Sequence, residues 1–552
     1  MKNLFPCIML FLLVMQNKIL IAQPLLTQPV FTRQDTLRGS IGEGRYWWDV
    51  MFYDITVKPD FMTKTINGNT IISFKVIKSR RQMQLDLQLP LQIDSILLNK
   101  VSLHFTKDGN VAWVDMPKFK ANSVHQINIF YHGRPHEASN PPWNGGWIWK
   151  TDQSGNPWMS VACQGLGASV WYPCKDHQSD EPDQGALLSI IASDSLQAIG
   201  NGRLISHASN LDGTTVWKWK VSSPINNYDI IPYIGQYSHW SDSLIAENNN
   251  VLSCDYWVLN YNLAKAKDQF SKNVHPMIKA FEYWFGPYPF AADGFKLVES
   301  PHLGMEHQSD IGYGNQFQNG YRGRDLSGTG WGMKWDFIII HESGHEWFGN
   351  NITTKDVADM WVHESFTAYS ETLFTQFYFG IEAGNDYVIG TRKNIKNDKP
   401  VIGPYGVNQE GSGDMYYKGS NMLHTIRHIA DNDSLFRMTL RKLNQIYYHK
   451  TVTGAEVERF MSKNLNKNLS KIFDQYLRTN QIPLLEYQIK DHQLQYRWTN
   501  CVQGFDMPLQ VRGCTQGWLY PSEKWKSKTL DVNLLSEELT IDRNFFATVR
   551  KV

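Results

Sequence analysis

The stretch WDFIIIHESGHEWFGNNITTKDVADMWVHESFTAYSE, residues 335–371, decides how this sequence is interpreted. Its first half contains an HExxH motif, in which His341, Glu342 and His345 follow four apolar residues. On a helix, two histidines four residues apart lie one turn apart on the same face. Two imidazoles so placed suit a tetrahedral zinc site, with Glu342 beside the metal as general base. The motif therefore predicts a zinc-binding helix.

The second half of the stretch supplies the remaining parts of such a site. Residues 361–380 have a helical pattern, and Gly380 stands where a C-cap is expected. Glu364 near the start of this segment is the expected third zinc ligand. Glu371 lies two turns further along the same face, where its carboxylate can accept the free ring N–H of a zinc-bound histidine.

A chance match has to be considered, because HExxH is short and also occurs in helices whose histidines lie at the surface. Here the motif directly follows four apolar residues, which indicates a mostly buried helix. Burial of Glu342 and Glu364 without a cation is energetically unfavourable. The zinc site is therefore the favoured interpretation.

Length and composition limit the class of protein. A chain of 552 residues is too long for one hydrophobic core and predicts two to four domains. The hydrophobic share of 42% and the charged share of 19% are typical of a globular protein. A net charge of +1 gives no argument for nucleic acid or an anionic membrane surface as a partner.

Residues 1–22 are predicted to be a secretory signal peptide. Lys2 precedes a short apolar run, and Ala22 is a small residue at the expected cleavage site. An uncleaved membrane anchor is the alternative, but the run is too short to span a bilayer. No later segment is apolar enough for a membrane span, so we expect an exported protein, periplasmic or secreted.

The cysteines fit an exported protein without a disulfide-rich fold. Of the 6 cysteines, Cys7 lies in the predicted signal peptide, which leaves an odd number and at least one free thiol. Cys501 and Cys514 flank a short turn-rich segment and could form a disulfide in an oxidising compartment.

The hydrophobic pattern changes twice along the chain and predicts a multidomain α+β protein. Residues 23–245 alternate with period two, as in YDITVKP and GNTIISFKVI, which predicts an N-terminal domain of antiparallel β-sheets. Residues 246–480 have mainly helical periodicity and contain the predicted zinc helices. Residues 481–552 return to short strands and predict a small β-sandwich.

Several motifs together resemble the zinc aminopeptidases of the aminopeptidase N family, relatives of leukotriene hydrolase. Glu364 follows HExxH after eighteen intervening residues, which is the gluzincin spacing. Residues 303–307, LGMEH, are similar to the G-x-M-E-N exopeptidase signature of the family, with His307 in place of Asn. Residues 416–419, YYKG, match its Y-x-K-G segment, and Gln164 stands where the family carries an amine-binding Gln or Glu.

The resemblance implies a thermolysin-like zinc domain and an aminopeptidase that acts on peptides. It implies one zinc ion per chain, with Glu342 as the base and the Tyr416 hydroxyl as the donor to the oxyanion. It further implies that Glu306 and Gln164 anchor the substrate α-amino group. The implied metal ligands are His341, His345 and Glu364, with Glu371 behind them, and the implied substrate-binding residues are Gln164, Gly304, Met305 and Glu306.

Three departures and three alternatives accompany this resemblance. Glu346 replaces the common Gln after the second histidine, and His363 stands where Asn usually precedes the third ligand. The sequence ends after the predicted β-sandwich, without the large helical domain of many relatives, so we expect a more open groove.

A zinc endopeptidase would not need Glu306 and Gln164. An epoxide hydrolase would use the same zinc with a lipid channel, and an inactive binding protein would not need intact ligands, base and tyrosine.

Overall fold

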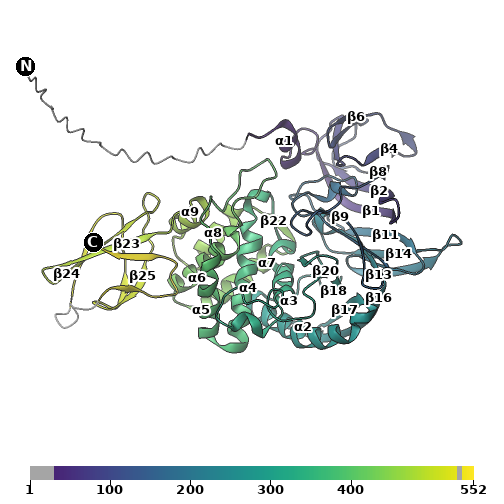
Figure 1. Ribbon diagram of the computed structural model, residues 1–552. Helices are drawn as coiled ribbons and strands as arrows, with labels where there is room; N and C mark the ends of the chain where they lie inside the picture. Colours follow the sequence, from purple (N-terminus) through teal and green to yellow (C-terminus); the bar gives the residue numbers. More distant parts are fainter. Residues whose placement is uncertain (1–29, 531–537) are drawn as a thin grey trace, which may run out of the picture.

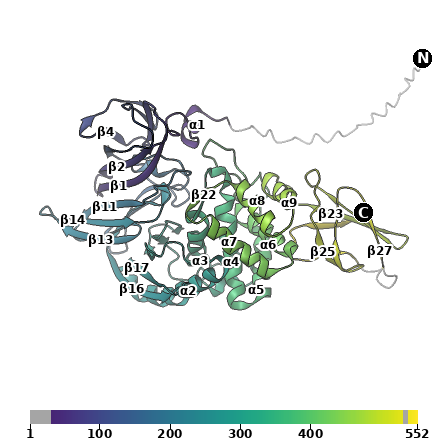
Figure 2. The same cartoon turned by 180° about the vertical axis from the view of Figure 1, so that it is seen from behind.

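The computed structural model describes residues 30–530 and 538–552. The predicted signal peptide, residues 1–22, lies outside the described residues. Three regions follow one another along the molecule: a β-rich N-terminal region, a helical region in the middle and a second β region at the C-terminal end (Figures 1 and 2). The predicted multidomain α+β fold is therefore confirmed.

The N-terminal region is built on one large, mainly antiparallel sheet. Its centre is the long hairpin of β1 and β2, whose side chains alternate between buried and partly exposed. This alternation is the period-two pattern of the sequence, and it directs one face of the sheet into the core. The strand order is β13 (Arg203–Ser209), β14 (Thr214–Val221), β11 (Ala186–Ser193), β1 (Trp48–Asp60), β2 (Thr65–Val76), β8 (Val124–Gly133), β4 (Gln92–Leu98) and β5 (Val101–Ser102).

Two smaller sheets and a short helix complete this region. The helix is α1 (Arg33–Gly39), which Thr32 and Asp35 begin with a capping box. The first small sheet has the order β3 (Gln82–Asp86), β7 (Val111–Asp115) and β6 (Phe105–Asp108). The second has the order β12 (Gln197–Ile199), β15 (Tyr233–Gly235), β10 (Pro157–Ala162) and β9 (Gly146–Thr151).

The middle region packs helices against a mixed sheet. The sheet has the order β16 (Tyr237–Ile245), β17 (Val251–Leu259), β18 (Phe295–Glu299), β20 (Ile311–Tyr313) and β19 (Gly304–Met305). The helices are α2 (Leu263–Phe285), α3 (Phe337–Gly344), α4 (Trp361–Phe379), α5 (Ile381–Gly390), α6 (Tyr417–Ala430), α7 (Asp433–Ile446), α8 (Gly454–Asn464) and α9 (Ser470–Arg478). The short strands β21 (Ile352–Thr354) and β22 (Lys450–Val452) pair in parallel.

The predicted domain boundary between residues 245 and 246 falls inside one hairpin. β16 and β17 pair along their whole length, from Tyr237 opposite Leu259 to Ile245 opposite Val251. β16 therefore belongs to the sheet of the middle region. The predicted limits of the functional domains stay a prediction.

The C-terminal region consists of two sheets that share a hydrophobic core with the helical region. The buried side chains of Leu485, Trp498 and Met507 belong to the same cluster as Phe473 and Tyr476 of α9. One sheet has the order β27 (Lys526–Thr529), β24 (Gln493–Thr499), β23 (Leu484–Lys490) and β29 (Thr548–Lys551). The other has the order β26 (Gly517–Leu519), β25 (Leu509–Arg512) and β28 (Thr540–Ile541).

The structure also bears on the predicted disulfide and on the absence of a predicted membrane span. Cys501 is a free thiol, so the bridge considered between it and Cys514 is not formed. Within residues 30–530 and 538–552, no helix is both long enough and apolar enough to cross a membrane.

Candidate zinc and substrate site

The first zinc-motif helix, α3, is fixed at its N-terminus by a buried aspartate. Asp336 is the N-cap, and its Oδ1 accepts from the backbone N–H of Ile338 at 3.2 Å. The other oxygen, Oδ2, accepts from the Tyr313 hydroxyl at 2.7 Å and from the Gln269 amide at 2.8 Å. These bonds tie the start of α3 to β20 and α2, so the helix carrying HExxH is held from two sides.

The three predicted zinc ligands meet where α3 faces the first turn of α4. His341 lies in the last turn of α3, His345 directly follows this helix, and Glu364 lies in the first turn of α4. The Oε2 atom of Glu364 lies 3.7 Å from His341 Nε2 and 3.5 Å from His345 Nε2. All three side chains are buried, and one donor atom of each lies within 4.8 Å of the others.

The donor set fits a zinc ion. Two imidazoles and one carboxylate, held by two helices, are the ligands of catalytic zinc sites that keep one position open. Glu364 Oε2 is buried and has no hydrogen-bond partner among the described residues, which is unfavourable unless a cation is bound. Burial by itself would raise the pKa of Glu364. The neighbouring His345 and His341 nevertheless hold this pKa below its usual range. A charged, unsatisfied carboxylate between two imidazoles is a suitable cation ligand.

Glu371 orients His341, as the helical spacing predicts. The His341 Nδ1 atom donates to Glu371 Oε1 at 2.7 Å, because a carboxylate only accepts. The proton therefore lies on Nδ1, and the lone pair of Nε2 points toward Glu364. The second Glu371 oxygen accepts from the Tyr387 hydroxyl of α5 at 2.6 Å, which holds the carboxylate in place.

His345 is oriented differently, by a backbone carbonyl. After Gly344 the helix changes into a π-helical turn, Glu346–Asn350, in which Phe348 and Gly349 leave the helical conformation. The chain thereby turns the Phe348 carbonyl oxygen toward His345 Nδ1, which donates to it at 3.0 Å. Gly349 has a φ of 129°, which favours glycine at this position.

The predicted base, Glu342, projects toward the strand that carries the exopeptidase signature. A Cβ atom added to Gly304 in β19 would lie 2.5 Å from Glu342 Oε1, so a larger residue there would displace the carboxylate from its position. One carboxylate oxygen each of Glu342 and Glu306 lies within 4.8 Å of a His345 ring nitrogen. Burial raises the pKa of Glu342 to about 7, a range suited to accepting and returning a proton.

The residues predicted to anchor the substrate amine also contact one another. Gln164, from the N-terminal region, donates its amide to Glu306 Oε1, and the Tyr228 hydroxyl donates to the same oxygen at 3.1 Å. Glu306 follows Gly304 and Met305 of β19, and its side chain is buried. The carboxylate therefore lies at the junction of the N-terminal and middle regions.

Tyr416 reaches the same site from the start of α6. Its ring centroid lies 6.0 Å from that of His341. Burial and the neighbouring carboxylates, Glu364 first among them, raise the pKa of its hydroxyl well above the ordinary value. The hydroxyl is therefore a neutral hydrogen-bond donor at every physiological pH.

The three residues that differ from the family pattern, Glu346, His307 and His363, do not belong to the candidate metal clusters of the described residues. Glu346 is buried and accepts from the Tyr288 hydroxyl at 2.7 Å, and burial raises its pKa to about 7. His307 forms a 2.8 Å hydrogen bond to Tyr233 through Nδ1. His363 accepts from the Thr354 backbone N–H at 2.9 Å through Nε2. Each departure is thus used inside the scaffold that surrounds the site.

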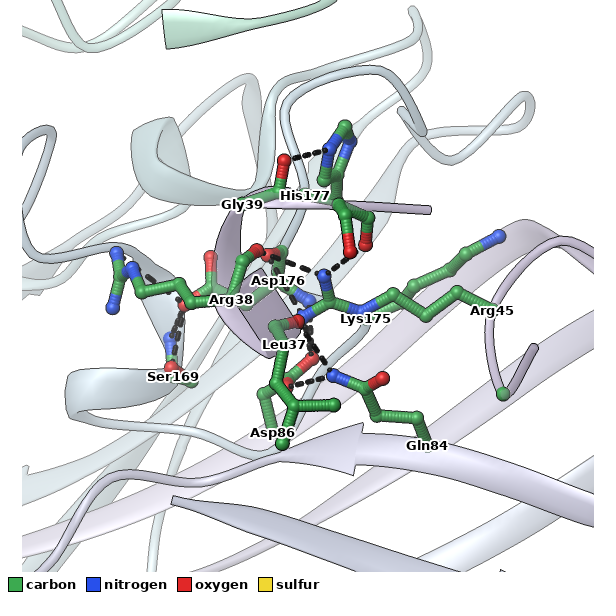
Figure 3. Close-up of polar contacts among 12 residues, drawn as sticks. Leu37, Arg38, Gly39, Arg45, Gln84, Asp86, Ser169, Lys175, Asp176 and His177 are labelled. Carbon is green, nitrogen blue, oxygen red and sulfur yellow. Dashed lines mark hydrogen bonds and ion pairs between the residues drawn. The ribbon is translucent and has the colours of Figure 1, made fainter. Parts of the chain in front are cut away.

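A small cavity beside the amine anchor is lined by Gln164, Tyr228 and the end of α1, which supplies Arg38 and Gly39. Figure 3 shows the polar contacts that hold this end of the helix. Arg45 donates to the Arg38 carbonyl at 2.8 Å and pairs with Asp86 at 2.6 Å. The fixed end of α1 therefore forms one wall beside the anchor.

Three groups of the site were not identified from the sequence. They are Tyr228, which donates to Glu306, Tyr387, which donates to Glu371, and the Phe348 carbonyl behind His345. The role of Tyr228 depends on a contact between the N-terminal and middle regions. The other two depend on the path of the chain, and no local sequence signal marks them.

The geometry defines a metallopeptidase-type site of two imidazoles and a glutamate on neighbouring helices, and the comparisons agree with it. Residues 333–476 match the Peptidase family M1 domain. Aminopeptidase N of Lactococcus lactis subsp. lactis is 20% identical over 80% of this chain and 52% of its own length. Probable aminopeptidase 2 of Sulfurisphaera tokodaii is 24% identical over 38% of this chain and 29% of its own length. The chain thus spans about half or less of these relatives.

Solved structures share the architecture. An M1 zinc metallopeptidase from Deinococcus radiodurans, crystallised as a mutant with a Tyr-Ser-Ala substrate, superposes with a TM-score of 0.65 at 17% identity. The match covers 80% of this chain and 97% of that chain. Residues 333–476 are therefore similar to the peptidase M1 domain, and the predicted resemblance to the zinc aminopeptidases is confirmed.

Proposed function

We propose that this protein is a zinc-dependent aminopeptidase that removes N-terminal residues from peptides. One observation carries the proposal: Gln164 and Tyr228 hold the buried Glu306 carboxylate beside Glu342 and His345 of the candidate metal cluster. A carboxylate at this position can bind the cationic α-amino group of a peptide at a fixed distance from the reacting carbonyl. An internal peptide bond carries no such cation and would leave Glu306 buried without a charged partner.

The residues of the site divide the reaction among them. Zinc, when held by His341, His345 and Glu364, supplies Lewis acidity and lowers the pKa of a water toward about 7. Glu342 accepts the proton of the attacking water and returns it to the leaving amine. The Tyr416 hydroxyl donates to the oxygen on which negative charge develops.

Further parts of the proposal concern metal content and location. The cluster of His341, His345 and Glu364 supports one catalytic zinc per chain. Zinc content of the purified protein should fall by one equivalent per chain when all three are replaced by alanine, and a zinc content equal to that of the unmodified protein would refute the assignment. The apolar run within residues 1–22 supports export and cleavage of a signal peptide. The N-terminal sequence of the secreted or periplasmic protein tests this directly.

Paired substrates test the peptidase class. The holoenzyme should hydrolyse aminoacyl-anilides and free-amine peptides, lose this activity with a chelator, and act poorly on N-acetylated peptides. Glu306→Ala should raise the KM for free-amine substrates much more than it lowers zinc content, whereas Glu306→Gln should be intermediate because it keeps hydrogen bonding without charge. Equal cleavage of free and acetylated peptides would favour an endopeptidase. Hydrolysis of an epoxide but no peptide would favour the epoxide hydrolases.

A further inference from the structure

A second cluster of metal-binding side chains lies where α2 packs near the hairpin β16–β17. Asp242 in β16 stands directly opposite Cys254 in β17, and His275 comes from α2. These three elements lie side by side at one end of the middle region in both views (Figures 1 and 2). One donor atom from each of the three residues lies within 4.8 Å of the others.

All three donor atoms lie within 4.8 Å of one another, so a small shift separates them from the spacing found around a bound ion. His275 Nε2 lies 2.9 Å from Asp242 Oδ1. In a tetrahedral zinc site with the usual bond lengths, donor atoms lie roughly 3.3–3.6 Å apart. The three atoms therefore need to rearrange by only about 1 Å. The side chains of Asp242 and His275 are 43% and 39% exposed, so rotation about their χ angles can supply this movement.

The ligand types point to one class of metal. A thiolate together with an imidazole selects zinc and similar thiophilic cations over magnesium and calcium, which prefer oxygen ligands. We propose that Asp242, Cys254 and His275 form a second metal site, for zinc or another thiophilic divalent cation, that joins α2 to the β16–β17 hairpin. Cys254 is buried and the other two ligands reach the surface, so a water can complete the coordination.

The proposed site is separate from the catalytic cluster. β16 and β19 are opposite edges of the same sheet, and β19 carries Gly304 and Met305 of the candidate active site. At ~4.8 Å between neighbouring strands, the two edges lie about 19 Å apart. The catalytic cluster contains no sulfur ligand. The second site therefore does not depend on the proposed aminopeptidase function.

The same residues also have an interpretation without a metal. Asp242 Oδ1 accepts from the Tyr256 hydroxyl at 3.1 Å as well as contacting His275. A surface ion pair would then connect helix and hairpin, and Cys254 would simply fill the core. The two interpretations differ in one measurable property, a bond between sulfur and metal.

Cobalt binding tests that property on the full chain after removal of metal. A thiolate-to-cobalt charge-transfer band requires a cysteine ligand, which the catalytic cluster lacks. We expect a band that saturates at one equivalent of Co²⁺ in Glu364→Ala, which lacks a catalytic ligand, that disappears in Cys254→Ser, and that persists in the control Cys501→Ser. Absence of the band from the unmodified protein, or its survival in Cys254→Ser, would overturn the proposal.

A second variant keeps the test decisive if Cys254→Ser fails to fold. His275→Gln changes a partly exposed side chain and retains the thiol. We expect at least tenfold weaker Co²⁺ binding at the sulfur-containing site, measured by the charge-transfer band, with an unchanged melting temperature of the metal-free protein. Unchanged cobalt affinity in His275→Gln would show that the three residues do not act as ligands together.

Discussion

At the scale of single residues, the candidate site depends on groups that fix the direction of the two histidines predicted to bind zinc. His341 is oriented by Glu371, which is itself held by Tyr387, whereas His345 is oriented by the Phe348 carbonyl. Both imidazoles therefore keep their protons on Nδ1 and direct the lone pairs of Nε2 to one point. This arrangement reduces the reorganisation needed when a metal binds.

The base can be tested without removing the metal site. Glu342→Gln keeps the size of the side chain but cannot accept the proton of the attacking water. We expect nearly complete loss of kcat with zinc content unchanged, because Glu342 is not among the predicted ligands. Zinc content by metal analysis and hydrolysis of an aminoacyl-anilide measure the two effects. Substantial turnover by this variant would assign the base to another group.

Tyr416→Phe removes one hydroxyl from the site. Loss of one oxyanion donor typically lowers kcat by about a hundredfold or more, with little change in KM. Steady-state kinetics measure the two constants separately. Near-normal kcat in this variant would transfer the role to another donor, and Tyr417 would be tested first.

Glu371→Ala tests the residue behind His341. Because the carboxylate fixes the proton and the ring orientation of His341, we expect zinc affinity to fall about 10–100-fold. Competition with a chelator of known affinity measures this change. Tyr387→Phe is the matched control, since it leaves the His341–Glu371 bond in place and should have a smaller effect. Equal zinc affinity in Glu371→Ala and the unmodified protein would contradict the assigned role.

At the scale of elements, the site is formed by the close packing of α4 against α6. A Cβ atom on Gly419 of α6 would lie 1.8 Å from the Ser365 hydroxyl oxygen of α4. The same Ser365 oxygen donates to the Met415 carbonyl at 2.7 Å. Ser365 follows the ligand Glu364, and Met415 precedes Tyr416. The glycine of the YYKG segment thus permits the contact that places Glu364 and Tyr416 near each other.

Gly419→Ala should disturb this contact. Overpacking of a buried contact costs about 1–3 kcal/mol, and the displaced helices should also weaken zinc binding. Thermal unfolding and zinc affinity measure the two effects. Gly413→Ala is the matched control, because an added Cβ there has nothing within 4 Å. If Gly419→Ala melts and binds zinc like the control, close helix packing does not position the site.

At the scale of the whole molecule, the C-terminal β region is part of the hydrophobic core of the helical region. The Tyr476 hydroxyl of α9 donates to the Phe546 carbonyl, and the Phe546 backbone N–H donates to Thr425 of α6 at 3.0 Å. Arg543 reaches Glu382 and Asp386 of α5 at 2.6 Å each. The segment between β28 and β29 therefore lies against α5, α6 and α9.

Deletion of residues 481–552 should consequently impair the fold of the helical region. The deletion exposes the buried faces of Phe473 and Tyr476, and burial of each large side chain contributes about 1.5–3 kcal/mol. We expect poor solubility and loss of the cooperative thermal unfolding transition. Circular dichroism measures this transition. A soluble truncated protein with the melting temperature of the full chain would show that the C-terminal region folds independently of the helices.

The sequence by itself determined the class of fold and most of the candidate site. HExxH and Glu364 are short-range patterns on two helices, and the helical period alone places His341, His345 and Glu371 on particular faces. The change from period two to helical periodicity and back predicts the order of β, helical and β regions, because burial of one face imposes that period. Gln164, Glu306 and Tyr416 were found by resemblance to the family.

Only the tertiary structure decided which distant groups complete the site. Tyr228, Tyr387 and the Phe348 carbonyl act through contacts between separate elements, and such contacts leave no periodic pattern in the sequence. The same holds for the hairpin that crosses residues 245 and 246, since a change in composition does not show which sheet a strand joins. The meeting of Asp242, Cys254 and His275 also depends on β-sheet register and helix packing. Long-range contacts of this kind form only when the complete core is assembled.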